Sequence, residues 1–305
     1  MGSALLLAGC GGEPDSGTAT GGLPAAGEAG GIAYALPSLP RSLDPLTAGA
    51  LPSRVVTAQV HEPLAAVVPA PYGGPPRPAG LAVAFRPSGD GALWTLQLRP
   101  GVRFADGTPF NAAAVIANSR RWTSSSVGRA LLPELFAVDS PRPGEVRFLL
   151  TRPVRDLRRR LSDVRLSIVS PESLDPQSGE GAGYTQSADS GTGAFTLSGG
   201  LRGGELARNP SWWGTELGLG PALDSVGFMA VVSAAGRASV LRARRAQIAG
   251  PLPLRTLRSL GADPLLRAAP GTGGGVAMEA SVRGLTGGGP LPRISAVWLT
   301  TIDRG

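Results

Sequence analysis

The clearest structural signal in this chain comes from residues 94–122, which read WTLQLRPGVRFADGTPFNAAAVIANSRRW. From Trp94 to Arg99, apolar and polar side chains alternate, and this period of two is typical of a half-buried β-strand. Pro100-Gly101 predicts a turn, after which Val102 and Phe104 predict a short continuation of the strand. The first half of the stretch is therefore expected to be β-structure with one buried face.

The second half of the stretch predicts a helix. Asp106-Gly107 favours a turn that tolerates positive φ, and Asn111 suits the cap of a helix that begins at Ala112. Arg120 and Arg121 lie in the expected last turn, where positive side chains favour the negative end of the helix dipole. The expected buried face of residues 112–122 comprises Val115, Ser119 and Trp122.

Neighbouring segments extend the expected β-structure. Residues 81–85 predict a strand that pairs with the Trp94 strand through a glycine-containing turn. Downstream we expect a polar loop at 123–127, an edge segment at 131–138 and a strand at 145–150. Residues 152–165 predict an arginine-rich helix whose arginines form either a solvated face or an anion-binding stripe. Its expected buried residues are Val154, Leu157, Leu161 and Val164.

The carboxyl-terminal half continues to alternate between strand and helix patterns. We expect strands at 195–197, 205–208 and 223–232, then a helix at 235–248. A crossover strand is expected at 276–280 and a last helix at 295–304. The helix at 235–248 is expected to place Ala238, Leu241, Arg245 and Ile248 along one face.

Residues 98–110 resemble the family 5 extracellular solute-binding proteins, which are the oligopeptide, dipeptide and nickel receptors of ABC importers. The family pattern L-R-x-G-V-x-F, followed by D-G-T-P-F, matches this segment at every fixed position. The acidic residue that usually follows the family's helix cap by three places is Ala114 here, so the capping box is missing. This loss is expected to weaken the helix start by up to about 1 kcal/mol.

Further motif blocks occur in the family's order. Residues 43–45 (LDP) and 62–64 (EPL) resemble its opening L-D-P and its later aromatic-E-P-L. Residues 190–195 (SGTGAF) resemble G-T-G-P-aromatic, with Ala194 in place of the proline, and residues 208–214 (RNPSWWG) resemble R-N-P-x-aromatic-W-G. Where the family has a helix that ends in G-E-x-D, this chain has Arg244, Arg245 and Gln247.

The resemblance covers residues 32–304 and implies an α/β fold of the type 2 periplasmic-binding-protein kind, with a mixed sheet and flanking helices. Such receptors have two lobes that close on a ligand, and we expect this chain to hold the first lobe with the second largely missing. The expected divisions are a lipoprotein signal remnant at 1–10, a flexible tether at 11–31, the first lobe at 32–275, and the crossover with a truncated start of the second lobe at 276–305.

Composition excludes several chemistries. The chain has 305 residues and a formal net charge of +7, and none of its 29 basic residues is lysine. A Walker A lysine, a pyridoxal Schiff base and a lysine general base are therefore excluded. One histidine and one cysteine do not supply the ligands of a zinc site built from His and Cys, and no cofactor is expected. The arginines are scattered and aromatic residues make up only 5%, so no nucleic-acid partner is expected.

The single cysteine lies in Leu7-Ala8-Gly9-Cys10, which resembles the bacterial lipobox. In that motif the thiol is lipidated, so Cys10 is the expected lipidation site. No positive residue precedes it and the leader is only nine residues long, which departs from a working signal. The alternative is an incidental thiol in a flexible amino terminus. Lipidation predicts an extracytoplasmic protein that is anchored to the cell membrane, in the periplasm or on the cell surface.

Two isolated signals have both a functional and a structural interpretation. His61, in place of the family's aromatic residue, is either a general base or metal ligand, or a partly buried residue at a helix end or turn. No second ligand set supports the metal. Gly191 and Gly193 resemble half of a dinucleotide loop, but the residues after them predict a strand, whereas a phosphate cradle needs a helix there.

The resemblance implies a substrate-binding lipoprotein of an ABC importer, for peptides, with no enzymatic activity and with ligand binding impaired by the truncation. The expected partners are an ABC permease, a peptide or other small solute, and the membrane through the lipid anchor. The alternative is a lipid-anchored interaction module, or a decayed gene product, without solute binding. A hydrolase that uses a serine near His61 lacks a nucleophile-elbow motif. No ligand-binding, catalytic or metal-binding residue is assigned.

Overall fold

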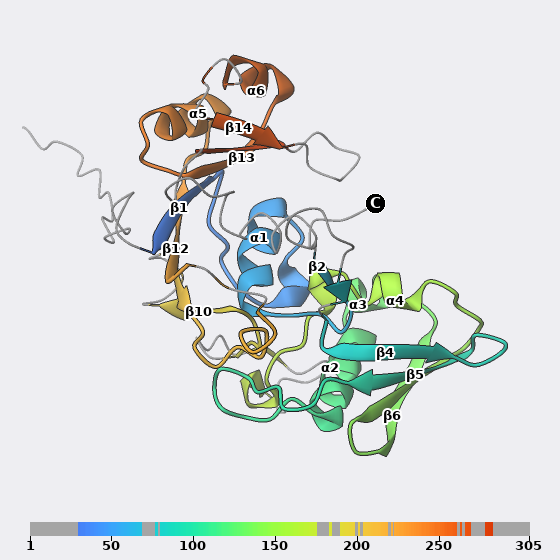
Figure 1. Ribbon diagram of the computed structural model, residues 1–305. Helices are drawn as coiled ribbons and strands as arrows, with labels where there is room; N and C mark the ends of the chain where they lie inside the picture. The colour runs from blue at the N-terminus through green and yellow to red at the C-terminus, as the bar shows by residue number, and fades with distance from the viewer. Residues whose placement is uncertain are drawn as a thin grey trace, which may run out of the picture.

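The computed structural model consists of two main β-sheets with helices packed against them (Figure 1). The residues that it describes are 30–68, 77–78, 80–175, 183–184, 190–198, 201, 204–218, 221, 223–260, 263, 266–269 and 278–282. Cys10, most of the expected tether and the expected helix at 295–304 lie outside these residues.

The larger sheet has seven strands in the order β10-β11-β12-β1-β13-β15-β14. The central strand β1 runs parallel to both of its neighbours, β12 and β13, whereas the other pairs are antiparallel. A strand with parallel partners on both sides is buried on both faces, and residues 32–36 of β1 are all buried. The strands are β1 Gly31–Leu36, β10 Phe195–Ser198, β11 Glu205–Arg208, β12 Ser225–Ala230, β13 Ile248–Leu252, β14 Leu266–Ala269 and β15 Met278–Val282.

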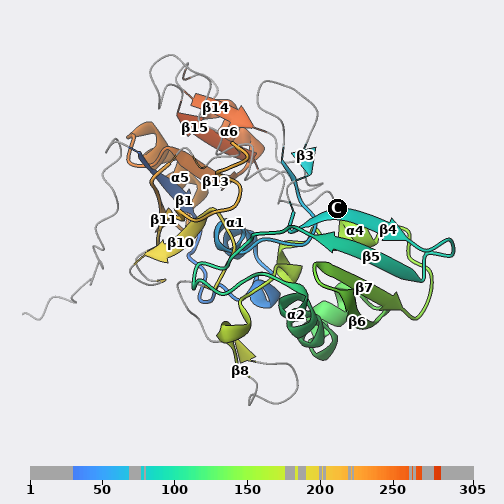
Figure 2. The same cartoon turned by 60° about the horizontal axis from the view of Figure 1, so that its bottom comes forward.

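Helices accompany this sheet because parallel strands must be joined by a crossover connection. α5 (Ala234–Arg242) connects β12 to β13, and α6 (Leu254–Leu260) follows β13. The two helices share an apolar cluster that includes Leu241 and Leu257. α1 (Leu51–Val60) lies between the two sheets (Figure 1, Figure 2) and buries its valines against the larger one.

The smaller sheet is fully antiparallel, in the order β4-β5-β7-β6. In β5, Trp94, Leu96 and Leu98 are buried while the residues between them are partly exposed, so the predicted alternation is confirmed. The predicted hairpin with the preceding strand is also present, because β4 pairs with β5. The strands are β4 Ala82–Pro87, β5 Leu93–Leu98, β6 Leu135–Arg142 and β7 Glu145–Leu150.

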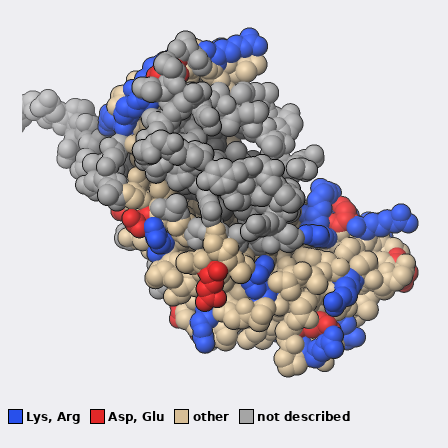
Figure 3. All heavy atoms as spheres, in the orientation of Figure 1, with Lys and Arg blue, Asp and Glu red and all other residues tan. Residues whose placement is uncertain are grey.

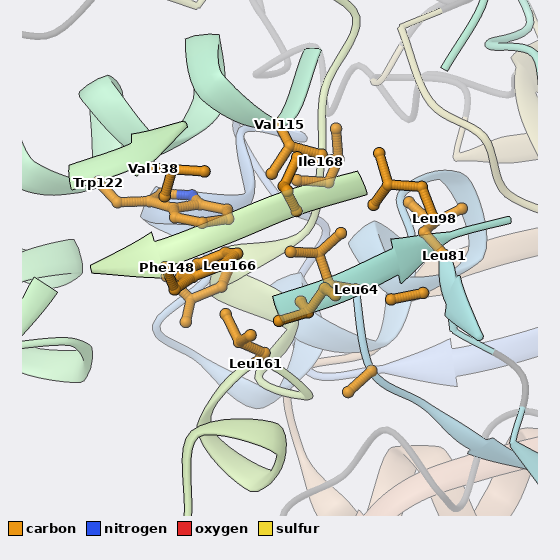
Figure 4. Close-up of a cluster of buried hydrophobic side chains, with 14 of the residues drawn as sticks. Leu64, Leu81, Leu98, Val115, Trp122, Val138, Phe148, Leu161, Leu166 and Ile168 are labelled. Carbon is orange, nitrogen blue, oxygen red and sulfur yellow. The ribbon is translucent and has the colours of Figure 1, made fainter. Parts of the chain in front are cut away.

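The apolar core of the smaller sheet forms between that sheet and α2 (Ala112–Ser124). Trp122 of α2 stacks on Phe148 of β7, with ring centroids 6.5 Å apart and planes at 27°. Figure 4 shows that side chains from outside the sheet, such as Leu64 and Leu161, point into the same cluster. The predicted buried face of α2 is confirmed: Val115, Ser119 and Trp122 are all buried.

The predicted cap of α2 is confirmed, but one of its arginines has a different role. Asn111 Oδ1 accepts a hydrogen bond of 3.1 Å from the Ala114 amide. Arg120 is exposed, as a dipole partner would be. Arg121 is buried instead and forms an ion pair with buried Asp44. The Leu-Asp-Pro motif thus provides the carboxylate that a buried guanidinium needs.

Several predicted element boundaries are wrong. The expected loop at 123–127 is helical, because Ser125 accepts a hydrogen bond of 2.8 Å from the Gly128 amide and caps a new helix, α3 (Ser126–Leu131). The strand expected at Val102 to Phe104 is a single bridge between Arg103 and Pro109. The edge strand begins at Leu135 rather than at residue 131.

The arginine-rich helix expected at 152–165 is also much shorter. Only α4 (Leu157–Arg160) and a 3-10 turn at Val164–Leu166 form there. Asp163 interrupts the helix, because its carboxylate accepts hydrogen bonds from the Arg165 amide and guanidinium. The predicted buried residues are correct: Val154, Leu157, Leu161 and Val164 are all buried.

The helix expected at 235–248 ends at Arg242, and Ile248 is already the first residue of β13. Arg245 is exposed rather than on a buried face. The helix ends because Arg244 turns into the left-handed region, with φ of 59°. A residue in this conformation commonly follows the end of a helix, but it is usually glycine, since a Cβ is strained there.

Short elements complete the described chain. They are β2 Val67–Val68 and β3 Arg77–Pro78, which pair with each other, β8 Leu174–Asp175 and β9 Gly183–Tyr184, which also pair, and 3-10 turns at Pro45–Thr47 and Pro171–Ser173.

We expect Arg244→Gly to raise the free energy of unfolding by about 0.5–1 kcal/mol, because it removes the Cβ from a left-handed position. The contact that is lost, between Arg244 and Asp263 at 3.7 Å, is long and partly exposed, so its contribution is small. Urea unfolding at neutral pH measures the change. Arg244→Ala is the matched control: it loses the same guanidinium but keeps Cβ, so no gain is expected. Equal changes in the free energy of unfolding for the two variants would contradict the backbone strain at position 244.

Candidate functional site

A partly buried carboxylate, Glu62, lies at the junction of the two sheets. Its oxygens accept hydrogen bonds from Thr192 Oγ1 at 2.8 Å, Trp212 Nε1 at 3.0 Å and Trp213 Nε1 at 2.8 Å. Glu62 follows α1, Thr192 precedes β10, and the tryptophans follow β11. Trp213 packs against the apolar clusters of both sheets, so this polar centre joins two otherwise separate cores.

Arg99 completes the centre from the smaller sheet. It follows β5, and its guanidinium carbon lies 4.0 Å from the centroid of the Trp213 ring. Its Nε and Nη2 each donate to the Gly80 carbonyl at 3.2 Å. A guanidinium over an aromatic face is attracted by the ring, so Arg99 holds the Trp213 indole in position for Glu62.

The charge state of Glu62 depends on pH in the neutral range. Burial raises the pKa of Glu62 from 4.5 to about 7, although the three hydrogen bonds and the positive charge of Arg99 act in the opposite direction. A neutral carboxyl group can keep all three contacts, because the Thr192 hydroxyl can accept the proton of the acid instead of donating. Both charge states are therefore compatible with this geometry.

The Gly-Thr-Gly motif places Thr192 next to Glu62 because its backbone packs closely against the end of α1. A Cβ on Gly191 would lie 1.8 Å from the Val60 carbonyl oxygen, and one on Gly193 would lie 2.4 Å from the Gln59 carbonyl oxygen. The Gly193 amide donates to the Val60 carbonyl at 2.9 Å. The strand that was predicted after this motif is present as β10, not a helix, so the geometry of a phosphate cradle is absent.

His61 is a structural residue of the core. It lies at the end of α1 and is fully buried, deeper than the partial burial predicted. Burial lowers its pKa to about 3, and the charge of Arg121 acts in the same direction, so the imidazole is neutral at physiological pH. Among the residues that the structure describes, no group of three His, Cys, Asp or Glu side chains could hold a metal ion.

A second feature is the carboxyl edge of the larger sheet, where β12, β1 and β13 end. The chain enters at β1, and its two parallel partners lie on opposite sides of it. Ligands of open α/β sheets bind outside the carboxyl ends of strands at such a switch point. Val232, just beyond β12, is 83% exposed, so this edge presents apolar surface to the solvent.

A buried arginine shapes this edge. Arg237 of α5 donates from Nη1 to the carbonyls of Val231 at 2.7 Å and Val232 at 2.8 Å, and from Nη2 to the carbonyl of Pro251 at 2.7 Å. It therefore ties the loop after β12 to the end of β13. The sequence analysis did not identify Arg237; the available signal was an arginine at core spacing, between Ala234 and Leu241.

Gln247 holds the beginning of β13 against β1. Its side-chain Oε1 accepts from the Ala33 backbone amide at 2.7 Å, while the backbone amide of Gln247 donates to the Ala33 carbonyl at 2.9 Å. Gln247 occupies the place of the final aspartate in the G-E-x-D motif of the family, and its side-chain oxygen serves as the acceptor there.

One apolar hollow lies under the sheet, between α1 and strands β10 to β12. It has room for about one water molecule, about 10 Å³, whereas pockets for small ligands usually measure 300–1,000 Å³. It is therefore not a solute site. Its lining is Leu39, Pro40, Val56, Leu197, Leu201, Gly204, Leu206 and Phe228.

With this geometry established, the family can be assigned. Residues 78–280 match the family model described as bacterial extracellular solute-binding proteins, family 5 Middle. This chain belongs to that family. The match spans β3 to β15, and it confirms the resemblance that was inferred from the sequence motifs. The family consists of solute-binding proteins of ABC importers rather than enzymes.

Curated relatives are similar over more than half of this family 5 chain. The probable D,D-dipeptide-binding periplasmic protein DdpA of Escherichia coli K12 is 29% identical over 184 residues, 59% of this chain and 35% of DdpA. The glutathione-binding protein GsiB of the same strain is 30% identical over 178 residues, 57% of this chain and 33% of GsiB. The match thus spans about a third of each relative.

Solved structures share the fold. The binding protein AgaA of A. tumefaciens R10, in complex with agropinic acid, superposes with a TM-score of 0.66 at 23% identity, over 80% of this chain and 48% of AgaA. DppA of Helicobacter pylori, in complex with the peptide STSA, gives 0.63 at 22% identity, over 80% of this chain and 51% of DppA. The expected periplasmic-binding-protein-like α/β fold is confirmed.

The pKa of Glu62 predicts how stability depends on pH. The folded protein binds this proton more tightly than the unfolded chain between pH 4.5 and 7, so the free energy of unfolding falls as pH rises through 7. In the parent protein we expect this fall in the free energy of unfolding to be about 1–2 kcal/mol between pH 5 and 8, after discounting for partial exposure. Glu62→Gln cannot titrate at this position, so its pH profile should lack the fall. Urea unfolding across this range measures both proteins.

The comparison with the parent protein isolates Glu62. His61 has a lowered pKa and acts in the opposite direction below pH 6.5, but it is present in both proteins. The carboxylates with lowered pKa act below pH 4.5; they are Asp90, Glu134, Asp139, Asp156 and Asp163. Glu172→Gln, at an exposed position, is the control and should keep the parent profile. If the free energy of unfolding of Glu62→Gln depended on pH as that of the parent does, the raised pKa assigned to Glu62 would be wrong.

Proposed function

We propose that this chain supplies one wall of the solute site of an ABC importer's binding protein, and that the solute is a peptide. The observation that carries the proposal is the switch point at the carboxyl edge of β12, β1 and β13. Family membership makes the class of function a solute receptor, and the exposed edge is where the fold accepts a ligand.

Peptide is the solute class that the relatives favour. DdpA is named for D,D-dipeptides, GsiB for glutathione, and DppA was solved with a peptide. Peptides bind in extended form through main-chain hydrogen bonds, and specificity comes from pockets for their side chains. The loops that Arg237 holds at residues 231–233 and 251–254 offer the exposed apolar side chains of Val232 and Leu254 for such a ligand.

The expected partners and location follow from the same function. We propose an ABC permease as the protein partner and an extracytoplasmic location, with Cys10 as the site of lipid attachment. The structure describes no residue near Cys10, and among the described residues no helix has the length and apolar character needed to span a membrane.

The described residues alone should bind peptide weakly. Val232 is largely exposed, so a ligand on this edge would be covered on one side only. Receptors of this kind trap their ligand by contacts from two faces. An impaired affinity is therefore part of the proposal, and a lipid-anchored interaction module without solute binding is the alternative.

The test is an NMR titration of the full chain with pools of di- to pentapeptides. We expect the amide signals of residues 231–233, Leu252 and Leu254 to shift, with dissociation constants of about 1 mM, which corresponds to about 4 kcal/mol of binding free energy. Val232→Arg should abolish the shifts, because it places a charge on the apolar edge.

Phe136→Arg is the matched control, since Phe136 is 72% exposed on β6 of the other sheet and should leave the titration unchanged. Micromolar or tighter binding would contradict the one-sided site. An absence of shifts at 10-fold higher peptide concentration would favour the interaction module, which capture of the permease by the chain would then test.

A further inference from the structure

Four exposed arginines gather on α5 and α6, and we call them the α5–α6 arginine face. Arg242 lies in the last turn of α5, Arg245 follows that helix, and Arg255 and Arg258 lie on α6. Blue side chains mark the surface over these two helices at the top of Figure 3.

Hydrogen bonding and helix periodicity place three of these arginines on one surface. Arg242 Nη2 donates to Ser259 Oγ at 3.1 Å, which joins the end of α5 to the end of α6. Arg255 is four residues before Ser259, and Arg258 is three residues after Arg255, so Arg255, Arg258 and Ser259 lie on one side of α6. The hydrogen bond to Ser259 brings Arg242 to the same side. The opposite side buries Leu257 and Leu260.

The charge of this face is not neutralised by described carboxylates. None of its four arginines forms an ion pair with a described residue; the nearest such pair joins Arg244 and Asp263 at 3.7 Å. The other arginine-rich surface, around α4, differs in this respect. There Arg152, Arg159 and Arg160 pair with Glu134 and Asp156 at 2.7–2.9 Å.

The topology places the ends of both helices at the amino edge of the larger sheet. β12, β1 and β13 are parallel, so α5 must run back from the carboxyl edge to the point where β13 begins. That point is next to the start of β1, because Gln247 exchanges two hydrogen bonds with Ala33. Arg242, Arg245 and Arg258 therefore lie at the edge of the sheet where β1 begins.

We propose that the α5–α6 arginine face binds the surface of a membrane that contains anionic phospholipids. The face is built on two packed helices and its guanidinium groups are exposed and separate, which suits a plane of phosphate groups. Each arginine near an anionic membrane contributes roughly fivefold to binding. A chain of about 20 residues between Cys10 and β1 spans about 25 Å on average when flexible, so a lipid on Cys10 would keep the face within reach.

The proposal deepens the proposed function, because it gives the receptor an orientation. The solute edge lies at the ends of the strands opposite to Arg242, Arg245 and Arg258, so it stays open to the solution when these arginines rest on the membrane. The electrostatic contact itself requires neither lipidation nor solute.

The experiment is sedimentation of the full chain, with Cys10→Ser to exclude lipid and thiol effects, with vesicles. We expect binding to vesicles of phosphatidylcholine with about 30% phosphatidylglycerol, on the order of 600-fold tighter than to phosphatidylcholine alone, because four arginines contribute roughly fivefold each. Binding should weaken strongly at high salt, because surface charges are screened. The variant R242Q/R255Q/R258Q should lose most of the preference for anionic vesicles.

The matched control is R86Q/R120Q/R155Q, which removes the same charge from exposed positions on other elements. It should bind like the parent, since net charge alone is not the cause. R255Q/R258Q keeps the hydrogen bond between Arg242 and Ser259, so it guards against a folding defect in the triple variant. Its affinity for anionic vesicles should fall about 30-fold.

Equal binding of the two triple variants, or no preference of the parent for anionic vesicles, would overturn the proposal. Neither result bears on peptide binding, which the NMR titration tests separately.

Discussion

The contact between Glu62 and the indoles of Trp212 and Trp213 joins the two halves of this structure. Each sheet has its own apolar core, and Trp213 is a residue that packs against both. Because indole N–H groups can only donate, their burial at the junction requires an acceptor. Glu62 provides one oxygen for each indole and a further contact for Thr192. The glycines around Thr192 are needed because the backbone approaches α1 more closely than any side chain permits.

A carboxylate at this place has a cost that an apolar residue would not have. Burial disfavours its charged form, which is why its pKa lies near 7. In return, the hydrogen bonds fix one relative position of the two sheets, whereas apolar contacts alone allow many. Arg99 supports the arrangement by stacking on Trp213. The same logic holds in the core beneath α2, where Asp44 and Arg121 form a buried pair.

The two edges of the larger sheet differ in chemistry, and our two proposals assign the solute to one edge and the membrane to the other. The carboxyl edge exposes apolar side chains, and Arg237 holds its loops in place. The guanidinium of Arg237 donates hydrogen bonds to three backbone carbonyls there. The amino edge carries arginines that have no carboxylate partner among the described residues. Both properties follow from parallel pairing around β1, since each crossover helix begins at one edge and ends at the other. A receptor of this family thus gains two chemically distinct ends from one sheet.

Local sequence determined the hairpin of β4 and β5, the cap at Asn111 and the buried faces of α2 and β5, because alternation and capping depend on near neighbours. The family was also evident from the sequence, since its motifs are short and contiguous. Tertiary structure decided the rest. Arg121 and Arg237 are buried because carboxylate or carbonyl partners from distant segments surround them, and no local pattern reveals such partners. Helix ends at Arg242 and Arg160 were set by a left-handed turn and by the Asp163 side chain, and the site at Glu62 exists only because residues 62, 99, 192, 212 and 213 meet across two sheets.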